Sequence, residues 1–435
     1  MTDVIEELTD WLETNWDPEI SVAEWWDRLG NGGWSAPSWP VEWFGKGLSR
    51  EETVRVQEKI ANFGALGAPG GLGLMLAGPT IVTHGSDDQR KLYLRDIVTG
   101  QKGWCQLFSE PGAGSDLAGL TCRADQDGDE WIVNGQKVWT SGGQAADLGM
   151  LIARTDWDVP KHQGISYFAL DMHQPGVDVR PLREMTGRAL FNEVFLTDAR
   201  TPNDTLLGGL NNGWAVANTT LANERASLGA GGGHAAASAA IPGTVAGHLE
   251  RRVGDFAPAG GGKRKGGGGG GAIGMMGGAS KLLIELAKGN GTVQDPTVRQ
   301  DLMRLHTMGE IGRYTNLRVK AAKEAGAEPP PAVGNIAKLS MSNMMRLQRD
   351  LSLRIVGAQG MCHAYDDSKR GELTDAVGNP FLPMITELAL FAQAPPIYGG
   401  TDQVQRNIIG ERVLGLPKEP NADRVTAFKD LPKNG

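Results

Sequence analysis

The sequence predicts a mostly α-helical protein with a central antiparallel β domain, in the order helical, β, helical. Apolar residues recur at three- and four-residue spacing up to about residue 100, and the period is two from about residue 104 to 205. The helical period then returns and persists to about residue 415, which is unlike a chain of parallel βαβ units. We therefore expect three domains, over residues 1–103, 104–205 and 206–435.

Composition argues against several classes of protein. The 435 residues include 43 Lys and Arg against 51 Asp and Glu, a net charge of −8, whereas nucleic-acid binding needs a basic face. Cys105, Cys122 and Cys362 are too few and too scattered for a disulfide framework or a structural zinc site, which fits a reducing compartment. The histidines have no metal-ligand spacing. We therefore expect neither a metal nor a nucleic acid partner.

Neither the start of the chain nor an uncharged run further on predicts a secretory or membrane segment. The first ten residues, MTDVIEELTD, are acidic and lack the basic stretch of a secretory signal. Residues 65–82 carry no charge, but five glycines and two prolines among these 18 residues predict a buried helix with turns. We expect a cytoplasmic protein without a membrane span.

The first hundred residues are expected to be helical. Apolar residues of the segment 5–12, IEELTDWL, have the spacing of one helix face, and a second helical pattern runs to a stop signal at Gly100. Between them lies a region rich in Pro and Gly, where aromatic residues are expected to pack beneath a long loop. These residues are Trp25, Trp26, Trp34, Trp39 and Trp43.

Alternating apolar residues predict the strands of the β domain. The segment 130–140, EWIVNGQKVWT, contains Asn134-Gly135, the pair most typical of a two-residue β-hairpin turn, because both positions need positive φ. We therefore expect a hairpin turn at these two residues. Further strands are expected at Met150–Ala153, Ile165–Leu170, Val177–Arg180 and Val194–Leu196.

The C-terminal part is expected to be helical, with one insertion. A helix should begin at Gly213, with Asn211 or Asn212 as its N-cap residue. Residues 260–278, GGGKRKGGGGGGAIGMMGG, are mostly glycine and have little to bury, which predicts a mobile surface loop. The basic residues 263–265 are expected to be solvated, with contact to a phosphate as the alternative.

The segment 104–119, WCQLFSEPGAGSDLAG, carries the first chemical signal. Gly112, Gly114 and Ser115 are small residues at close spacing after a strand, and such residues let backbone N–H groups approach a ligand. Taken alone, the segment indicates either a backbone nest for an anion or flat polar ring, or a surface turn without a ligand.

Four motifs together make the chain resemble the acyl-CoA dehydrogenases, the FAD-dependent family that desaturates acyl-CoA thioesters. They are FSEPGAGSD at 108–116, NGQKVWTS at 134–141, FNEVF at 191–195 and YGGTDQVQRN at 398–407, and the resemblance covers nearly the whole chain. It implies a helical–β–helical fold and tetramers built as dimers of dimers. It also implies that FAD lies at a subunit interface.

The resemblance also implies which residues would meet FAD and substrate. Residues 106–109 would line the flavin ring, Trp139 would cover one face of it and Ser141 would reach N5. Ser115 would contact the pantetheine arm of CoA, and Thr401 and Gln403 would hold the pyrophosphate and adenosine side of FAD. The full cofactor set is Gln106, Leu107, Phe108, Ser109, Trp139, Thr140, Ser141, Arg354, Gly357, Thr401 and Gln403, and the substrate set is Ser115, Arg225, Tyr398 and Gly399.

The catalytic base departs from the commonest pattern of the family. Most members carry Glu between the Tyr and Gly of the C-terminal motif, where this chain has Gly399, whose backbone N–H could still bind the thioester oxygen. Glu224 is the best candidate base, because it shares the apolar face of its predicted helix with Leu221. The run 221–225, LANER, resembles the L-x-x-E-R run of the isovaleryl- and long-chain-specific branches. A buried ion-pair carboxylate without a catalytic role is the alternative.

Two elements that reach FAD across the subunit interface in the family are altered. The R-x-x-F element has no clean match, since Arg252 and Phe256 are one residue too far apart. The Q-x-x-G-G-x-G run appears at 354–360 as RIVGAQG, where Arg354 could pair with a phosphate through its fork of donors.

These observations predict a FAD-dependent acyl-CoA dehydrogenase of fatty acid β-oxidation. A carboxylate would take the α-proton of the thioester, and the β-hydrogen would leave as hydride to flavin N5. Electron-transferring flavoprotein is the expected acceptor, and a homotetramer the expected assembly. Two alternatives stay open: a non-catalytic FAD- or CoA-binding subunit of a heteromer, and an oxidase or monooxygenase on the same fold. Acyl chain length and branching are not determined.

Overall fold

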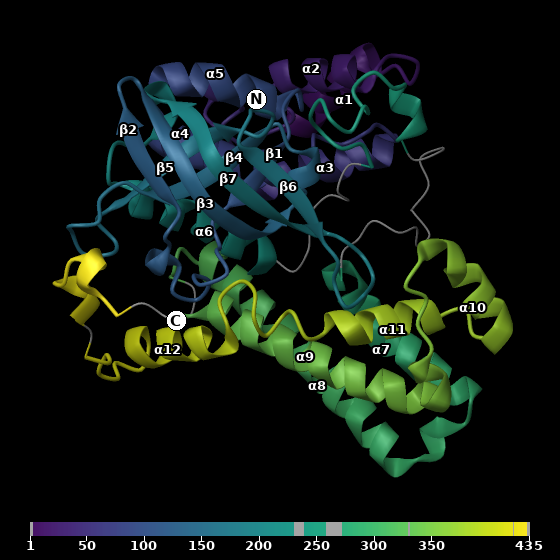
Figure 1. Ribbon diagram of the computed structural model, residues 1–435. Helices are drawn as coiled ribbons and strands as arrows, with labels where there is room; N and C mark the ends of the chain where they lie inside the picture. Colours follow the sequence, from purple (N-terminus) through teal and green to yellow (C-terminus); the bar gives the residue numbers. More distant parts are fainter. Residues whose placement is uncertain (1–2, 230–238, 258–271, 329–330, 421, 433–435) are drawn as a thin grey trace.

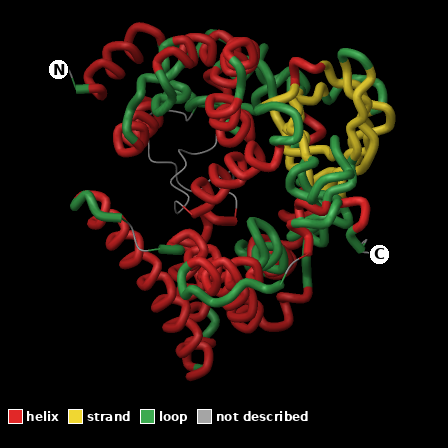
Figure 2. The backbone as a smooth tube through the Cα atoms, turned by 90° about the vertical axis from the view of Figure 1, so that its left-hand side faces the viewer, coloured by secondary structure: helices red, strands yellow, loops and turns green. Residues whose placement is uncertain are grey.

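The computed structural model describes residues 3–229, 239–257, 272–328, 331–420 and 422–432. Helices come first, a sheet follows, and helices return, so the expected order is confirmed. The N-terminal helices lie along one side of the sheet, and the C-terminal helices gather at the opposite end of the molecule (Figures 1 and 2). In the described part of the chain no helix is long and apolar enough to cross a membrane.

Five α-helices, a π-helix and a short 3-10 helix at Val41–Trp43 form the N-terminal part from residue 3 onward. Capping boxes at Ser49 and Ser86 begin two of them, because each serine accepts from a backbone N–H three residues on while that residue's side chain bonds back. Leu8 and Leu12 of the first helix are fully buried, as their spacing predicts. The elements are α1 (Val4–Asn15), α2 (Val22–Asn31), α3 (Arg50–Phe63), the π-helix η2 (Gly73–Ala77), α4 (Gly78–His84) and α5 (Asp87–Val98).

The tryptophan cluster is only partly a loop feature. Trp25 and Trp26 lie on α2, so the expectation that they belong to the Pro- and Gly-rich loop region was wrong for these two residues. Their indole N–H groups donate to the carbonyls of Leu66 and Gly67, at 2.8 and 2.9 Å, and thereby hold the connection between α3 and η2. These hydrogen bonds satisfy the buried indole N–H groups and the two carbonyls, and the apolar spacing of the helix alone does not predict them.

The central sheet has eight strands in the order β6-β7-β3-β2-β4-β5-β8, with β1 paired to β4. Neighbours are antiparallel except for β1 with β4 and one bridge between Arg123 and Arg154. The parallel β1 places residues 106–107 next to the middle of the sheet. The strands are β1 (Trp104–Leu107), β2 (Arg123–Asp127), β3 (Glu130–Ser141), β4 (Leu148–Arg154), β5 (Ile165–Asp171), β6 (Val177–Leu182), β7 (Phe191–Pro202) and β8 (Leu206–Leu207).

Asn134-Gly135 is not a hairpin turn, so this prediction was wrong. Both residues lie inside β3, at a β-bulge against β7, and the hairpin between β2 and β3 turns at Gly128 instead. The Asn134 side chain accepts from the Asp198 N–H at 2.9 Å. A Cβ at Gly135 would lie 2.8 Å from Cys122 Cα, so glycine is needed where β3 approaches the residue before β2.

Seven helices complete the described C-terminal part. The helix α6 contacts β5, η2 and α4 on one side and α9 on the other, so it connects the sheet to the C-terminal helices. Leu283, Leu305 and Leu351 belong to a separate core where α7, α8 and α9 meet. The helices are α6 (Gly213–Gly229), α7 (Ala272–Gly289), α8 (Pro296–Glu324), α9 (Val333–Val356), α10 (Arg370–Val377), α11 (Leu382–Phe391) and α12 (Asp402–Arg412).

The glycine-rich run 260–278 divides into two parts. Residues 260–271 lie outside the described residues. Residues 272–278 belong to α7, so the expected loop was wrong for this part. The second half of α7 buries Leu283 and Ala287 against α8 and α9, and such packing outweighs the poor helix propensity of glycine in the first half.

Candidate active site

The Glu224 carboxylate on α6 lies beside the Gln106 side chain at the end of β1. Glu224 is half-buried, and burial raises the pKa of its carboxyl, while Gln106 and the charge of Arg225 offset the rise only in part. The Gln106 amide nitrogen is itself buried and has no hydrogen-bond partner of normal geometry among the described residues. The Glu224 carboxyl and the Gln106 amide therefore lie side by side between α6 and β1, each able to make further hydrogen bonds.

Buried hydroxyl groups hold this part of α6 in place. Thr220 Oγ1 lies 2.9 Å from Thr80 Oγ1 and 3.3 Å from the Tyr167 hydroxyl. The Tyr167 ring packs edge-on against Phe108, with ring centroids 5.9 Å apart, and Leu221 packs on the same core. The helix α6 thus has a defined position relative to the start of the loop that follows β1.

A buried ion pair anchors that loop. Glu110 accepts hydrogen bonds from the Thr121 and Cys122 N–H groups, at 2.7 and 2.9 Å, and Lys137 Nζ lies 2.8 Å from its Oε1. Burial opposes ionisation, but the lysine and the N–H donors hold the pKa of Glu110 below its usual value. Neither residue is among the site residues predicted from the sequence; the available signal was one acidic and one basic residue in two motifs that already pointed to the same ligand.

The same lysine links the loop to β3. Lys137 Nζ also donates to the Phe108 carbonyl at 3.1 Å, and the Val138 N–H donates to the Ser109 carbonyl at 2.9 Å. The residues that follow on β3 belong to the predicted flavin set. Strands 104–107 and 130–141 therefore bring the two halves of that set, 106–109 and 139–141, to one place.

Trp139 has an unusual conformation for a strand residue. Its φ is +62° and its side chain is 61% exposed, with the ring edge-on to Phe191 at 5.8 Å. A non-glycine residue in this region of φ is strained, and such strain clusters at ligand sites. Thr140 is buried and its hydroxyl has no partner among the described residues, whereas Ser141 is exposed. An exposed aromatic face beside unpaired polar groups fits a flat, polar-edged ring such as the flavin of FAD.

The small residues Gly112, Gly114 and Ser115 of the loop are exposed. A Cβ added at Gly112 or Gly114 would meet nothing within 4 Å. The carboxylate of the next residue, Asp116, pairs with Lys161 at 2.9 Å. Ser115 therefore lies on an open surface, and the ion pair of Asp116 with Lys161 fixes the position of the residue next to it.

The C-terminal motif forms its own hydrogen-bonded unit. Thr401 caps α12 by accepting from the Val404 N–H at 3.1 Å, and Gln405 donates to the Gly399 carbonyl at 2.8 Å. Gly399 has a φ of +62°. Beside these residues, Tyr398 is partly buried, which raises the pKa of its hydroxyl, and Gln403 is exposed.

The α9 helix holds this motif through one carboxylate. Asp402 is buried and pairs with Lys338 at 2.9 Å and with Arg346 at 2.5 Å. Arg354 lies eight residues after Arg346, about 12 Å further along the helix. It is exposed and pairs with Asp301 of α8 at 3.0 Å. The helix α9 thus holds the start of α12, with Thr401 and Gln403, through Asp402 and carries Arg354 near its own end.

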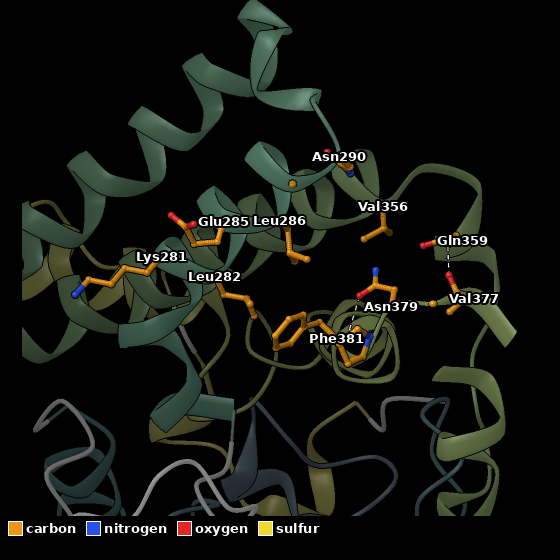
Figure 3. A pocket seen from close by; sticks show the side chains of 13 residues that line it. Lys281, Leu282, Glu285, Leu286, Asn290, Val356, Gln359, Val377, Asn379 and Phe381 are labelled. Carbon is orange, nitrogen blue, oxygen red and sulfur yellow. Dashed lines mark hydrogen bonds between the residues drawn. The ribbon is translucent and has the colours of Figure 1, made fainter. Parts of the chain in front are cut away.

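A pocket of about 620 Å³ opens at the end of α9 (Figure 3). Val356 and Gln359 in its wall flank Gly357, which ends α9 with a φ of +61°. The opposite wall comes from α7 and from the α10–α11 connection, including Leu282 and Phe381. Arg252, by contrast, pairs with Glu19 and Asp255 on the surface near α2, far in the fold from this helical core.

The chain is similar in sequence to known enzymes over nearly its whole length. Residues 2–101, 105–199 and 267–414 match the profiles of the N-terminal, middle and C-terminal domains of acyl-CoA dehydrogenase. The chain is 34% identical over 400 residues to the acyl-CoA dehydrogenase IpdE1 of Mycobacterium tuberculosis, covering 91% of this chain and 88% of that protein. It is 32% identical over 394 residues to FadE34 of the same organism, covering 90% of this chain and 46% of that protein.

Solved structures of acyl-CoA dehydrogenases share the fold of this chain. A Tcur3481-Tcur3483 steroid ACAD variant is 25% identical, with a TM-score of 0.66 over 95% of this chain and 98% of that one. The ChsE4-ChsE5 complex from Mycobacterium tuberculosis has the same fold, with a TM-score of 0.64 at 24% identity over 96% of this chain and 99% of that one. The chain is a member of the acyl-CoA dehydrogenase family, and it is a FAD-dependent acyl-CoA dehydrogenase.

Proposed function

We propose that this protein introduces an α,β double bond into an acyl-CoA thioester, with Glu224 as the base that removes the α-proton. The observation that carries this proposal is the half-buried Glu224 carboxyl, with its raised pKa, beside Gln106. A carboxylate needs such a rise to be an effective base near neutral pH.

Two groups of this chain would act on the thioester. Glu224 would accept the proton from Cα, since its environment disfavours the charged form and so strengthens its basicity. The Gly399 backbone N–H would donate to the thioester oxygen, where negative charge develops as the proton leaves. Bound FAD supplies the acceptor for the β-hydride.

The cofactor would be held by groups from three regions. Residues 106–109 and the hydroxyls of Thr140 and Ser141 would meet the edge of the flavin, and Trp139 would cover one face. Thr401 and Gln403 would face the pyrophosphate and adenosine side. Arg354 and Gly357, beside the pocket at the end of α9, would serve the same side across a subunit interface.

An exposed stripe on α8 supports association of several chains. Met303, Ile311, Tyr314 and Leu317 are between 49% and 61% exposed, at a spacing that places them near one helix face. We propose a dimer of dimers built of identical or of different chains. The similar ChsE4-ChsE5 protein is a complex, which favours the second form. Electron-transferring flavoprotein is proposed as the acceptor on the family resemblance alone.

A non-catalytic subunit of a heteromer is the second candidate, and Gly399 favours it, because glycine replaces the commonest base. Anaerobic titration with acyl-CoA, followed at the flavin absorbance band, separates the two. The panel should include straight-chain, branched and steroid-bearing thioesters, since similar proteins include an isovaleryl-CoA dehydrogenase and a steroid ACAD.

Loss of the flavin absorbance band with at least one of these thioesters would support the dehydrogenase proposal. No bleaching of FAD-loaded protein, alone or with a partner chain, would overturn it. Fast reoxidation by O₂ with product bound would instead favour an oxidase.

A further inference from the structure

The C-terminal segment 422–432 lies against the connection between β4 and β5, residues 155–164, at the left of Figure 1. The Phe428 N–H donates to the Val159 carbonyl at 2.9 Å, and the Lys429 N–H donates to the Trp157 carbonyl at 3.0 Å. A segment more than 250 residues away in sequence thus continues the hydrogen bonding of this connection.

An aromatic side chain seats the segment. The Phe428 ring packs against Trp157 with centroids 5.3 Å apart, and the Arg154 guanidinium lies over the ring at 3.5 Å. Arg154 is fully buried and donates to the carbonyls of Ala118, at 2.6 Å, and Leu120, at 3.1 Å. The Arg154 guanidinium thus contacts Phe428 and also holds the C-terminal end of the loop 108–121 through these two hydrogen bonds.

A second link reaches the middle of that loop. The Lys161 side chain is only 8% exposed, and its ammonium pairs with Asp116 at 2.9 Å and with Asp423. Asp116 directly follows Ser115, the exposed residue of the predicted pantetheine contact. One buried cation thus joins the C-terminal segment to the residue beside Ser115.

We propose that residues 422–432 form a strap that holds the Ser115 loop in the shape that binds the CoA arm of the substrate. Lys161 acts as a positioning residue, sharing its charge between the strap and the loop. The proposal rests on the proposed function, because it takes a CoA thioester as the ligand. It predicts that the strap affects substrate affinity and leaves flavin binding and the chemical step largely unchanged.

The test compares two truncations of the FAD-loaded enzyme. Ending the chain after Pro420 removes the strap, and ending it after Pro432 removes only residues 433–435 and is the control. Without the strap, the loop must be ordered by the substrate itself, so KM for acyl-CoA should rise about tenfold, with kcat within about threefold and FAD content unchanged. An unchanged KM, or an equal fall of kcat, would overturn the proposal.

Point variants keep the test informative if the truncated protein does not fold. Asp423→Asn should raise KM in the same direction, and Asp423→Glu, which keeps the carboxylate, should restore it in large part. Equal KM for both variants and the wild type would contradict the role of Lys161. Failure of the proposed function has a different signature, because the wild type itself would then show no flavin bleaching with any thioester.

Discussion

Lys137 Nζ and Glu110 Oε1 lie 2.8 Å apart, with the lysine side chain 0% and the glutamate side chain 5% exposed. The lysine also donates to the Phe108 carbonyl, and the glutamate accepts from the N–H groups of Thr121 and Cys122. Each charged group thus has polar partners besides the other, which offsets part of the cost of burying the charges. The pair connects the two segments that we propose to enclose the flavin.

Lys137→Met should therefore destabilise the protein and loosen FAD. Removing one partner of a buried pair costs about 3–5 kcal/mol, because the other charge is left buried. Arg200→Met is the matched control, since Arg200 pairs with Glu130 on the surface of the same sheet and should matter by less than about 1 kcal/mol. Thermal unfolding and FAD release measure both. Equal behaviour of the two variants would contradict the anchoring role.

Glu224→Gln should keep the fold and FAD but lose turnover. The amide has the shape of the carboxylate without its basicity, so the rate should fall by at least about 10²–10⁴-fold. Glu58→Gln, on the exposed face of α3, is the control and should be fully active. Steady-state turnover and flavin bleaching are the measurements, and full activity of Glu224→Gln would remove this residue from the mechanism.

The raised pKa of Glu224 predicts a dependence of stability on pH. A group whose pKa is raised in the folded state stabilises fully below its unfolded value of 4.5, and this stability is lost as pH rises through the folded value. Glu224→Gln should therefore be more stable than the wild type at neutral pH, with the difference shrinking in acid. Thermal unfolding of both proteins across pH tests this, and a stability difference between them that does not change with pH would contradict the burial of the charge.

Trp139→Ala should change the flavin more than the fold. The side chain is 61% exposed, so its removal exposes little new core, whereas stacking on an aromatic contributes about 0.5–1.5 kcal/mol beyond area burial. FAD affinity should fall and the flavin spectrum should shift, with the unfolding temperature nearly constant. A large loss of stability with unchanged flavin absorbance would argue that Trp139 packs against protein instead.

A carboxylate restored at position 399 should replace one missing at 224 only in part. We expect Glu224→Gly with Gly399→Glu to recover measurable desaturation compared with Glu224→Gly alone. Gly399 has a φ of +62°, where a side chain costs about 1–3 kcal/mol, so recovery should be incomplete. Gly399→Glu alone should be neutral or harmful, because two nearby carboxylates repel. Activity is compared among the three variants, and no recovery would argue against a shared position for the two bases.

Much of the fold could be read from local patterns. The spacing of apolar residues and the positions of Gly and Pro predicted the helical–β–helical order, and most expected strands lie within a few residues of the observed ones. These signals could be read because they depend on near neighbours in the chain. The placement of Glu224 on a half-buried helix face follows from the same local periodicity. Its role as base remains a prediction.

Other features depend on residues that only folding brings together. Asn134-Gly135 has the composition of a turn, but contacts with Asp198 on β7 and with Cys122 just before β2 accompany a bulge instead. The contact between Lys137 and Glu110 joins residues 27 apart, and that between Lys161 and Asp423 joins residues 262 apart. Neither pairing leaves a periodic trace, because a salt bridge needs only two side chains and its energy depends on the burial that surrounds them.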